Sequence, residues 1–242
     1  MKKGHAILRS LTETFGSSAD ILVPRVCPIC GTALTGAEDL LCMSCLMAVP
    51  RTYIHRLAAC KLADRMLRHA PGCRAASWFH YSHGSDYAQL ILDLKYRDMP
   101  RLGSAMGAAF ARELQADGFL DAVDAIVPVP LHWLRKLRRG YNQSELIARG
   151  VAEVCGAEVV TGVLKARAHR SQTRYDRDER SLNANRHIYY ISNPSLLHGR
   201  NVLLVDDIAT TGSTLEACVS VIARTCQPAS IRILTLGLTE NQ

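Results

Sequence analysis

The stretch VLLVDDIATTGST, residues 202–214, gives the clearest indication of the fold. Four apolar residues run into two adjacent carboxylates, which are followed by a threonine-glycine-serine turn and then by a helical pattern. Such an apolar run is typical of a strand buried on both faces of a parallel sheet, and α/β folds bind ligands where these strands end. We therefore expect a strand over 201–205, a ligand-binding turn, and a helix over 213–226.

The turn has the chemistry of a phosphate site. Its backbone N–H groups and hydroxyls can surround one phosphate, and the following helix adds its positive N-terminal end. Gly212 permits close approach of the backbone. Asp206 and Asp207 then stand about one sugar away, where they can accept hydrogen bonds from ribose hydroxyls. A solvated strand end alone would explain the two aspartates, and a simple helix cap alone would explain the turn. Neither explains why the aspartates and the turn are contiguous. The Walker A pattern is absent.

Strands and helices alternate along the chain after residue 74, which predicts a parallel sheet covered by helices on both faces. The Ala and Gly content of 102–114 indicates close helix packing. Residues 165–187 are charged and almost free of apolar side chains, so they predict a long exposed loop with a functional role. The remaining expected strands are 75–81, 124–129, 158–161 and 229–238, and the expected helices are 87–96, 102–114 and 142–155.

Two Cys-x-x-Cys pairs lie eleven residues apart near the N-terminus. Two such knuckles can complete a tetrahedral site, so we expect a structural zinc ion, with an iron–sulfur centre or a redox pair as alternatives. Cys60 and Cys73 each lack a Cys-x-x-Cys partner, and their part in a second metal site stays open. The candidate ligands are Cys27, Cys30, Cys42 and Cys45.

Length and charge set the outer bounds. The 242 residues carry a formal net charge of +7, which favours an anionic partner such as a phosphorylated small molecule or a nucleic acid. The N-terminal segment predicts a short amphipathic helix and not a signal peptide, so we expect a cytoplasmic protein without a membrane span. We expect three regions: a helix over 1–23, a zinc ribbon over 24–74, and an α/β domain over 75–242.

The segment 202–214 resembles the signature of type I phosphoribosyltransferases, which binds 5-phosphoribosyl-1-pyrophosphate (PRPP). The wider chain resembles the ComF family, which is linked to competence and includes GntX-type proteins. The resemblance also includes IVPVPLHWLRKLRRGYNQ (residues 126–143) and a later pattern from Arg167 to Asn185. It implies a type I phosphoribosyltransferase fold preceded by a small zinc ribbon.

The resemblance also implies roles for individual residues. Asp206 and Asp207 would bind the ribose 2′- and 3′-hydroxyls and are the candidate catalytic residues, with Mg²⁺ entering alongside PRPP. The wider PRPP site would comprise Asp206, Asp207, Ile208, Ala209, Thr210, Thr211, Gly212, Ser213 and Thr214. The pyrophosphate side would be formed by Pro130, Leu131, His132 and Arg139. A closing lid would present Lys165, Arg167, Arg170, Gln172 and Arg174.

Two functions are compatible with these features. The first is Mg²⁺-dependent transfer of the phosphoribosyl group to or from a nucleobase-like acceptor that the sequence does not identify. The second is a non-catalytic module that binds PRPP, a nucleotide or single-stranded DNA in competence-related DNA uptake. Further partners to consider are competence proteins and, by family analogy, a second copy of the chain in a homodimer.

Overall fold

The computed structural model describes residues 25–36, 38–96, 99–131, 140–167 and 188–239. The chain forms two compact units, 1–49 and 50–242. The expected N-terminal helix over 1–23 lies outside the described residues. Among the helices that the structure describes, none combines the length and apolar character needed to cross a bilayer.

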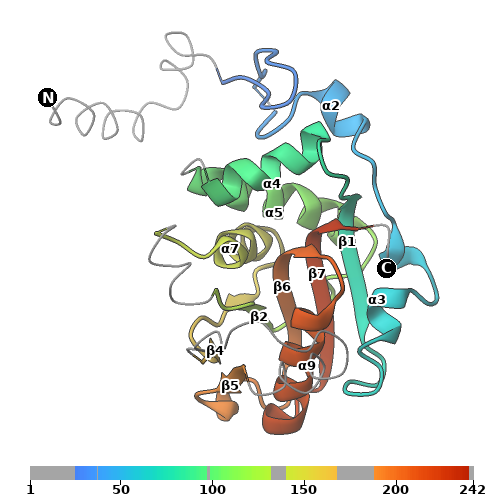
Figure 1. Ribbon diagram of the computed structural model, residues 1–242, viewed down its shortest axis with the longest axis vertical. Helices are drawn as coiled ribbons and strands as arrows, with labels where there is room; N and C mark the ends of the chain where they lie inside the picture. Colours follow the sequence, from blue (N-terminus) through green and yellow to red (C-terminus); the bar gives the residue numbers. More distant parts are fainter. Residues whose placement is uncertain (1–24, 37, 97–98, 132–139, 168–187, 240–242) are drawn as a thin grey trace, which may run out of the picture. The chain divides into compact units, whose positions relative to one another are not determined.

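The larger unit is built on a five-stranded parallel sheet in the order β1-β7-β6-β2-β3 (Figure 1). Strand β2 is buried throughout, and β6 is buried over its apolar run 202–205, as the apolar runs in the sequence predict. The sheet confirms the expected α/β class. The strands are β1 (Arg74–His80), β2 (Ala125–Pro128), β3 (Glu158–Val159), β6 (Asn201–Ala209) and β7 (Ser230–Leu238).

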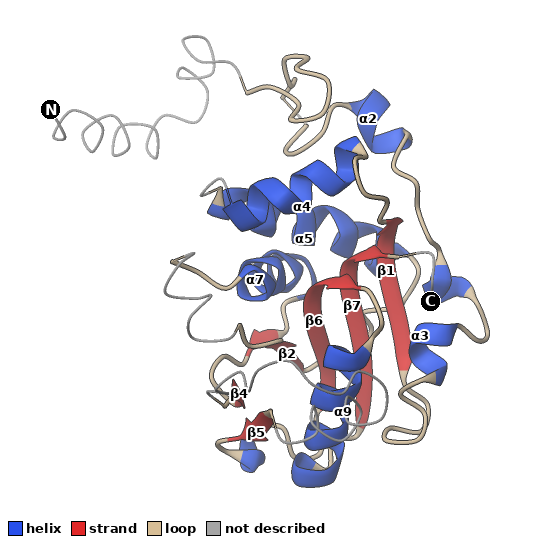
Figure 2. Ribbon diagram, in the orientation of Figure 1, coloured by secondary structure: helices blue, strands red, loops and turns tan. Residues whose placement is uncertain are grey.

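Helices cover both faces of the sheet. On one face, α9 packs together with α3 over alternate residues of the central strands, including Val202, Leu204 and Ile233. Figure 2 shows α4, α5 and α7 grouped apart from α9. The bounds are α3 (Lys61–Asp64), α4 (Asp86–Tyr96), α5 (Pro100–Ala116), α7 (Gln143–Cys155) and α9 (Ser213–Cys226), with short η2 (Ile54–Arg56) and η4 (Pro194–Leu196) and, in the smaller unit, α2 (Met43–Met47).

Helices α5 and α7 pack at close range, as the small residues predict. A Cβ atom added at Gly107 would overlap the carbonyl of Ile147, and one added at Gly150 would overlap the carbonyl of Ser104. Glycine is therefore required at these two positions by the neighbouring backbone. This contact fixes the position of α7, whose first turn enters the candidate site.

Strand β6 is longer than expected. It continues through the two aspartates, because Asp206 and Ile208 still pair with Thr235 and Gly237 of β7. A two-stranded antiparallel ribbon of β4 (Leu164–Ala166) and β5 (Tyr189–Ile191) was not expected, and it forms the base of the charged segment.

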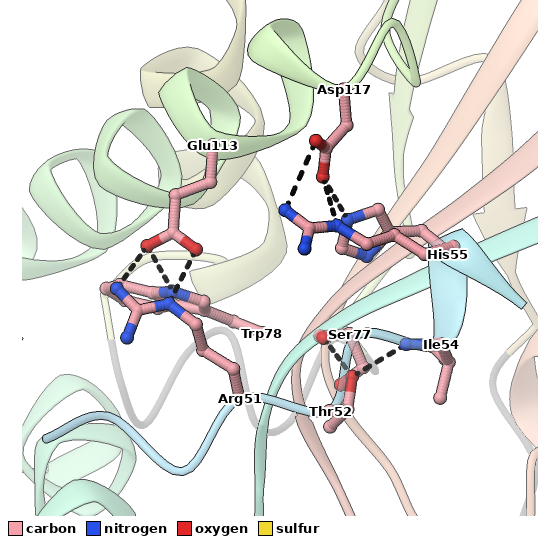
Figure 3. Close-up of polar contacts among 9 residues, drawn as sticks. Arg51, Thr52, Ile54, His55, Ser77, Trp78, Glu113 and Asp117 are labelled. Atoms are coloured by element: carbon pink, nitrogen blue, oxygen red, sulfur yellow. Dashed lines mark hydrogen bonds and ion pairs between the residues drawn. The ribbon is translucent and has the colours of Figure 1, made fainter. Parts of the chain in front are cut away.

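Residues 50–74, which we assigned from the sequence to the zinc-ribbon region, pack within the larger unit. Leu62 and Met66 are buried in the core beneath α9. Figure 3 shows polar anchors of this segment: Arg51 forms a bidentate ion pair with Glu113 of α5, with two N···O distances of 2.8 Å. His55 Nε2 lies 2.8 Å from a carboxylate oxygen of Asp117.

Candidate functional site

The candidate site lies where β6 ends and α9 begins. Asp206 Oδ1 accepts hydrogen bonds from Ser144 Oγ and from the backbone N–H of Asp207, each at 2.9 Å. Lys95 Nζ of α4 lies 3.0 Å from Asp207 Oδ2. Each aspartate of the pair is therefore held by a side chain from a different helix, and one carboxylate is paired with a cation.

Burial, and after it the neighbouring negative charge of Asp207, raise the pKa of Asp206 to about 7. The hydrogen bonds from the Asp207 N–H and from Ser144, together with the charge of Lys95, act in the opposite direction. Two adjacent carboxylates at the end of a buried strand are costly to ionise together. A pKa shift of this kind, with a specific charge partner, is typical of ligand-binding sites.

Ser144 reaches the acid pair because of the way α7 begins. Asn142 caps the helix: its side-chain oxygen accepts from the Ser144 N–H at 3.2 Å. Its side-chain nitrogen donates to the carbonyl of Val129 at 3.0 Å, next to the end of β2. One amide side chain thus ties the helix start to the same sheet edge that carries Asp206.

The turn that follows β6 is short and well anchored. Gly212 adopts a left-handed conformation with φ of 70°, and its carbonyl accepts from the N–H of Glu216 at the start of the 14-residue α9. The hydroxyls of Thr211 and Ser213 lie 3.0 Å apart. Thr239 fixes the other side by donating its hydroxyl to the carbonyl of Thr210 at 3.2 Å. The loop thus brings hydroxyls and a helix N-terminus together, with Thr210, Thr211 and Thr214 exposed.

The expected pyrophosphate side is described in part. Pro130 and Leu131 are half-buried and follow β2, the strand beside β6, and the Val129 N–H donates to the carbonyl of Val205 at 2.8 Å. The segment therefore leaves the same edge of the sheet as the acid pair. His132 and Arg139 lie outside the described residues.

Two of the expected lid residues are described. Lys165 belongs to β4 and Arg167 follows it, and both are exposed. The guanidinium of Arg167 lies 5.6 Å from the ring centroid of Tyr190 across the ribbon. Arg170, Gln172 and Arg174 lie outside the described residues, so the lid stays a prediction.

The sequence reasoning did not identify Lys95 and Ser144. Lys95 lies in the last turn of the helix expected over 87–96, where nothing local distinguishes it from a surface cation. Ser144 directly follows the Gly-Tyr-Asn-Gln end of the 126–143 segment. Its position two residues after a helix-capping asparagine is the one local feature of the sequence that could have indicated its role. Without the topology, the sequence does not reveal that these two side chains contact Asp207 and Asp206.

The four cysteines of the smaller unit come together. Their Sγ atoms all lie within 4.8 Å of one another, the only such group of three or more metal-ligating side chains in the described part of the chain. Gly31 turns the first knuckle with φ of 73°, and its N–H donates to the carbonyl of Cys27 at 2.8 Å. A set of four sulfurs at this spacing fits a tetrahedral metal such as zinc.

The thiols differ in acidity. The hydroxyl of Thr32 holds the pKa of Cys30 down at about 6, whereas burial raises the pKa of Cys45 above its ordinary value. Cys60 and Cys73 do not join this group; both line a pocket formed by residues 54–75 in the larger unit. Burial also raises the pKa of both of these thiols, which favours the inert, protonated form.

A parallel sheet with an acid pair, a hydroxyl-rich turn and a helix start at one edge defines a phosphoribosyltransferase-type domain. The chain belongs to the phosphoribosyl transferase domain family, whose model matches residues 101–238, and within it to the ComF type. It is 28% identical to the DNA utilization protein YhgH of Escherichia coli over 207 residues, covering 82% of this chain and 84% of that protein.

Two further relatives extend the comparison. The chain is 26% identical over 220 residues to YhgH of Salmonella typhimurium, which covers 84% of this chain and 93% of the relative. It is 33% identical over 94 residues to Competence protein F of Haemophilus influenzae, which covers 38% of this chain and 41% of the relative. The expected resemblance to a ComF-type phosphoribosyltransferase with a cysteine-rich N-terminal region is confirmed.

Proposed function

We propose that the chain binds PRPP at the end of β6, with Asp206 and Asp207 on the ribose hydroxyls and the 210–214 turn on the 5′-phosphate. The observation that carries this proposal is the continuity of the site. The acid pair, the turn and the N-terminus of α9 follow one another within nine residues, 206–214, at the carboxyl edge of a parallel sheet. One phosphorylated ribose matches that order.

Mg²⁺ fits this site only as a companion of PRPP. No group of three or more potential metal ligands occurs there among the described residues, so the two carboxylates alone would hold the ion weakly. When bound with PRPP, Mg²⁺ would neutralise charge on the pyrophosphate leaving group. The side chains that could contact such a complex directly are Asp206 and Asp207.

We propose further that the domain transfers the phosphoribosyl group to or from a nucleobase-like acceptor. Asp207, kept in place by Lys95, would orient the sugar, and Asp206, held by Ser144, would accept from the second hydroxyl. Fixing the ribose in this way would direct C1 toward the segment after β2, where Pro130 would begin the pyrophosphate side. Lys165 and Arg167 at the base of the proposed lid would add positive charge near the departing pyrophosphate.

A second candidate function is favoured by the names of the relatives, which refer to DNA utilization and to competence. In this alternative the domain binds PRPP, a nucleotide or single-stranded DNA without transferring a group. The formal net charge of +7 is compatible with a polyanionic partner. We propose a cytoplasmic location and a homodimer for either function.

The test is calorimetric titration of Mg–PRPP against the wild type and the Asp206→Asn, Asp207→Asn and Gly212→Val variants. Asparagine keeps the size but weakens charge-assisted hydrogen bonds, which corresponds to a roughly ten- to hundred-fold loss of affinity. Valine at position 212 should abolish binding, because it obstructs the backbone and strains a residue with φ of 70°.

Glu158→Gln is the matched control, since Glu158 is exposed at the opposite edge of the sheet and should leave the affinity unchanged. Circular dichroism checks that every variant is folded. If the wild type binds neither PRPP nor any 5′-phosphorylated ribose, the proposal fails. Binding of fluorescent single-stranded DNA by that same protein would then favour the second function.

A further inference from the structure

A guanidinium from the segment that precedes the phosphoribosyl transferase match reaches the turn that follows β6. Arg65, directly after α3, donates from Nη2 to Ser213 Oγ at 3.4 Å and from Nε to Glu216 Oε2 at 2.8 Å. Ser213 Oγ in turn lies 3.0 Å from Thr211 Oγ1. The guanidinium is therefore linked through one hydroxyl to the residues that would surround the 5′-phosphate.

The charges around this contact do not cancel. Two guanidinium groups face one carboxylate: Arg65 and Arg68 both approach Glu216, the second at 3.5 Å. His69 Nε2 also lies 3.5 Å from the same carboxylate. Glu216 sits in the first turn of α9, where the helix itself contributes positive potential. Among the described groups that contact Glu216, the charge balance is thus positive, which suits an added anion.

Arg65 and Arg68 differ in how far their side chains are buried. The side chain of Arg65 is 29% exposed, whereas that of Arg68 is 61% exposed, and only Arg65 also reaches Ser213. A half-buried guanidinium is less screened by solvent and already held by two partners, so little entropy is lost when it binds an anion. Arg68 is the natural comparison, because it carries the same charge to the same carboxylate from a more exposed position.

We propose that Arg65 is a specificity-determining residue for the 5′-phosphate of PRPP. This arginine belongs to the segment that precedes the phosphoribosyl transferase match. This inference rests on the proposed function. The hydroxyls of Ser213 and Thr211 bond to each other, and Ser213 Oγ also accepts a hydrogen bond from Arg65. On binding, they turn to the phosphate and Arg65 follows Ser213, adding charge to a dianion that the loop otherwise holds through neutral donors.

The experiment compares two probes, each of which represents one end of PRPP. Ribose 5-phosphate and Mg–pyrophosphate are each titrated by calorimetry into the wild type and into Arg65→Met, Arg65→Lys and Arg68→Met. We expect Arg65→Met to weaken ribose 5-phosphate binding about tenfold, the loss of one charge-assisted hydrogen bond, and to leave pyrophosphate binding unchanged. Lysine should restore part of the affinity, and Arg68→Met should change it less than about twofold.

The outcomes separate the two proposals. A wild type that binds no ribose 5-phosphate contradicts the proposed function itself. A wild type that binds it, with Arg65→Met binding equally well, overturns the role of Arg65 alone. An equal loss for both probes in a folded Arg65→Met also overturns it, since that result shows a general structural effect. If Arg65→Met does not fold, the Arg65→Lys titration decides by the same comparison of the two probes.

Discussion

Lys95 and Asp207 form an ion pair at 3.0 Å that joins the last turn of α4 to the end of β6. Both side chains are largely buried, at 18% and 15% exposure. Asp207 is thereby paired with a cation while its neighbour Asp206 is paired with a hydroxyl. Burial raises the pKa of Asp206 to about 7, so this carboxyl group is only partly ionised near neutral pH.

We predict that Lys95→Met moves PRPP binding to higher pH. The positive charge of Lys95 helps to lower the pKa of Asp206, so removing it should raise that pKa above about 7. The variant should bind PRPP more weakly than the wild type at pH 7.5 and approach it near pH 9. Comparison at equal pH cancels the ionisation of the ligand.

Calorimetric titrations at several pH values measure this shift. Lys95→Arg keeps the charge and should preserve the wild-type profile, and Arg149→Met removes a 60% exposed cation elsewhere and should have no effect. Parallel profiles for the wild type and Lys95→Met would contradict the electrostatic role.

Asp206→Asn should stabilise the protein at high pH. The native pKa of about 7 exceeds the ordinary value near 3.9, so the native state binds more protons than the unfolded state between these values. Stability is therefore lost as pH rises from about 4 to about 7. Asparagine keeps an oxygen for the Ser144 hydroxyl and the Asp207 N–H without the charge.

Urea unfolding of the wild type and Asp206→Asn at pH 4 and pH 8 tests this. We expect the free energies of unfolding to agree at pH 4 and the variant to exceed the wild type by roughly 1–3 kcal/mol at pH 8. In our proposal, Asp206→Asn also binds PRPP more weakly than the wild type. The aspartate would therefore be kept for ligand binding although it lowers the stability of the protein. A constant difference at both pH values would show that Asp206 does not titrate as described.

Glu113 should be a strong anchor of the 50–74 segment. Its carboxylate accepts two bonds from Arg51 and one from Trp78 Nε1 at 3.1 Å, and the Arg51 side chain is only 15% exposed (Figure 3). Glu113→Gln removes the carboxylate charge that accepts from Arg51 and should lower the free energy of unfolding by about 1.5–3 kcal/mol. Glu145→Gln, which breaks an exposed i,i+4 pair with Arg149, should cost less than about 0.5 kcal/mol in the same urea titrations.

Gly150→Ala should destabilise the larger unit, because its Cβ would overlap the backbone carbonyl of Ser104. The helices must move apart, and we expect a loss of at least about 2 kcal/mol in thermal or urea unfolding. Gly156→Ala is the control: its φ is 73° and nothing lies within 4 Å of the added atom. It should cost only about 1 kcal/mol, from backbone strain. Similar losses for the two variants would mean that α5 and α7 are less tightly packed than described.

The sequence predicts the strands and helices of the sheet domain well and the segment 50–74 less well. The helix expected over 213–226 has those bounds in the structure, because the Gly-Ser start and the apolar periodicity are both local signals. The segment 50–74 carries no such signal. Its helices are single turns, and it is held by remote partners such as Glu113 and Asp117.

The candidate site shows the same division. The acid pair and its turn are contiguous, so the sequence was sufficient to identify them. Lys95, Ser144 and Arg65 come from separate elements. The first two contact the acid pair and the third contacts the turn, because the strand order β1-β7-β6-β2 brings those elements to one region. Single-sequence periodicity carries no information on such contacts.

Purified protein should contain one equivalent of zinc, bound by Cys27, Cys30, Cys42 and Cys45. Their Sγ atoms lie within 4.8 Å of one another, and a unit this small has little apolar core to hold the knuckles without a metal. Cys42→Ser should lose the zinc and unfold the 24–48 segment, while the larger unit keeps its own core and its thermal transition. Cys155→Ser, outside the group of four, should retain the metal. Elemental analysis and calorimetric melting measure both effects, and protein without metal, or with a brown iron chromophore, would refute the zinc site.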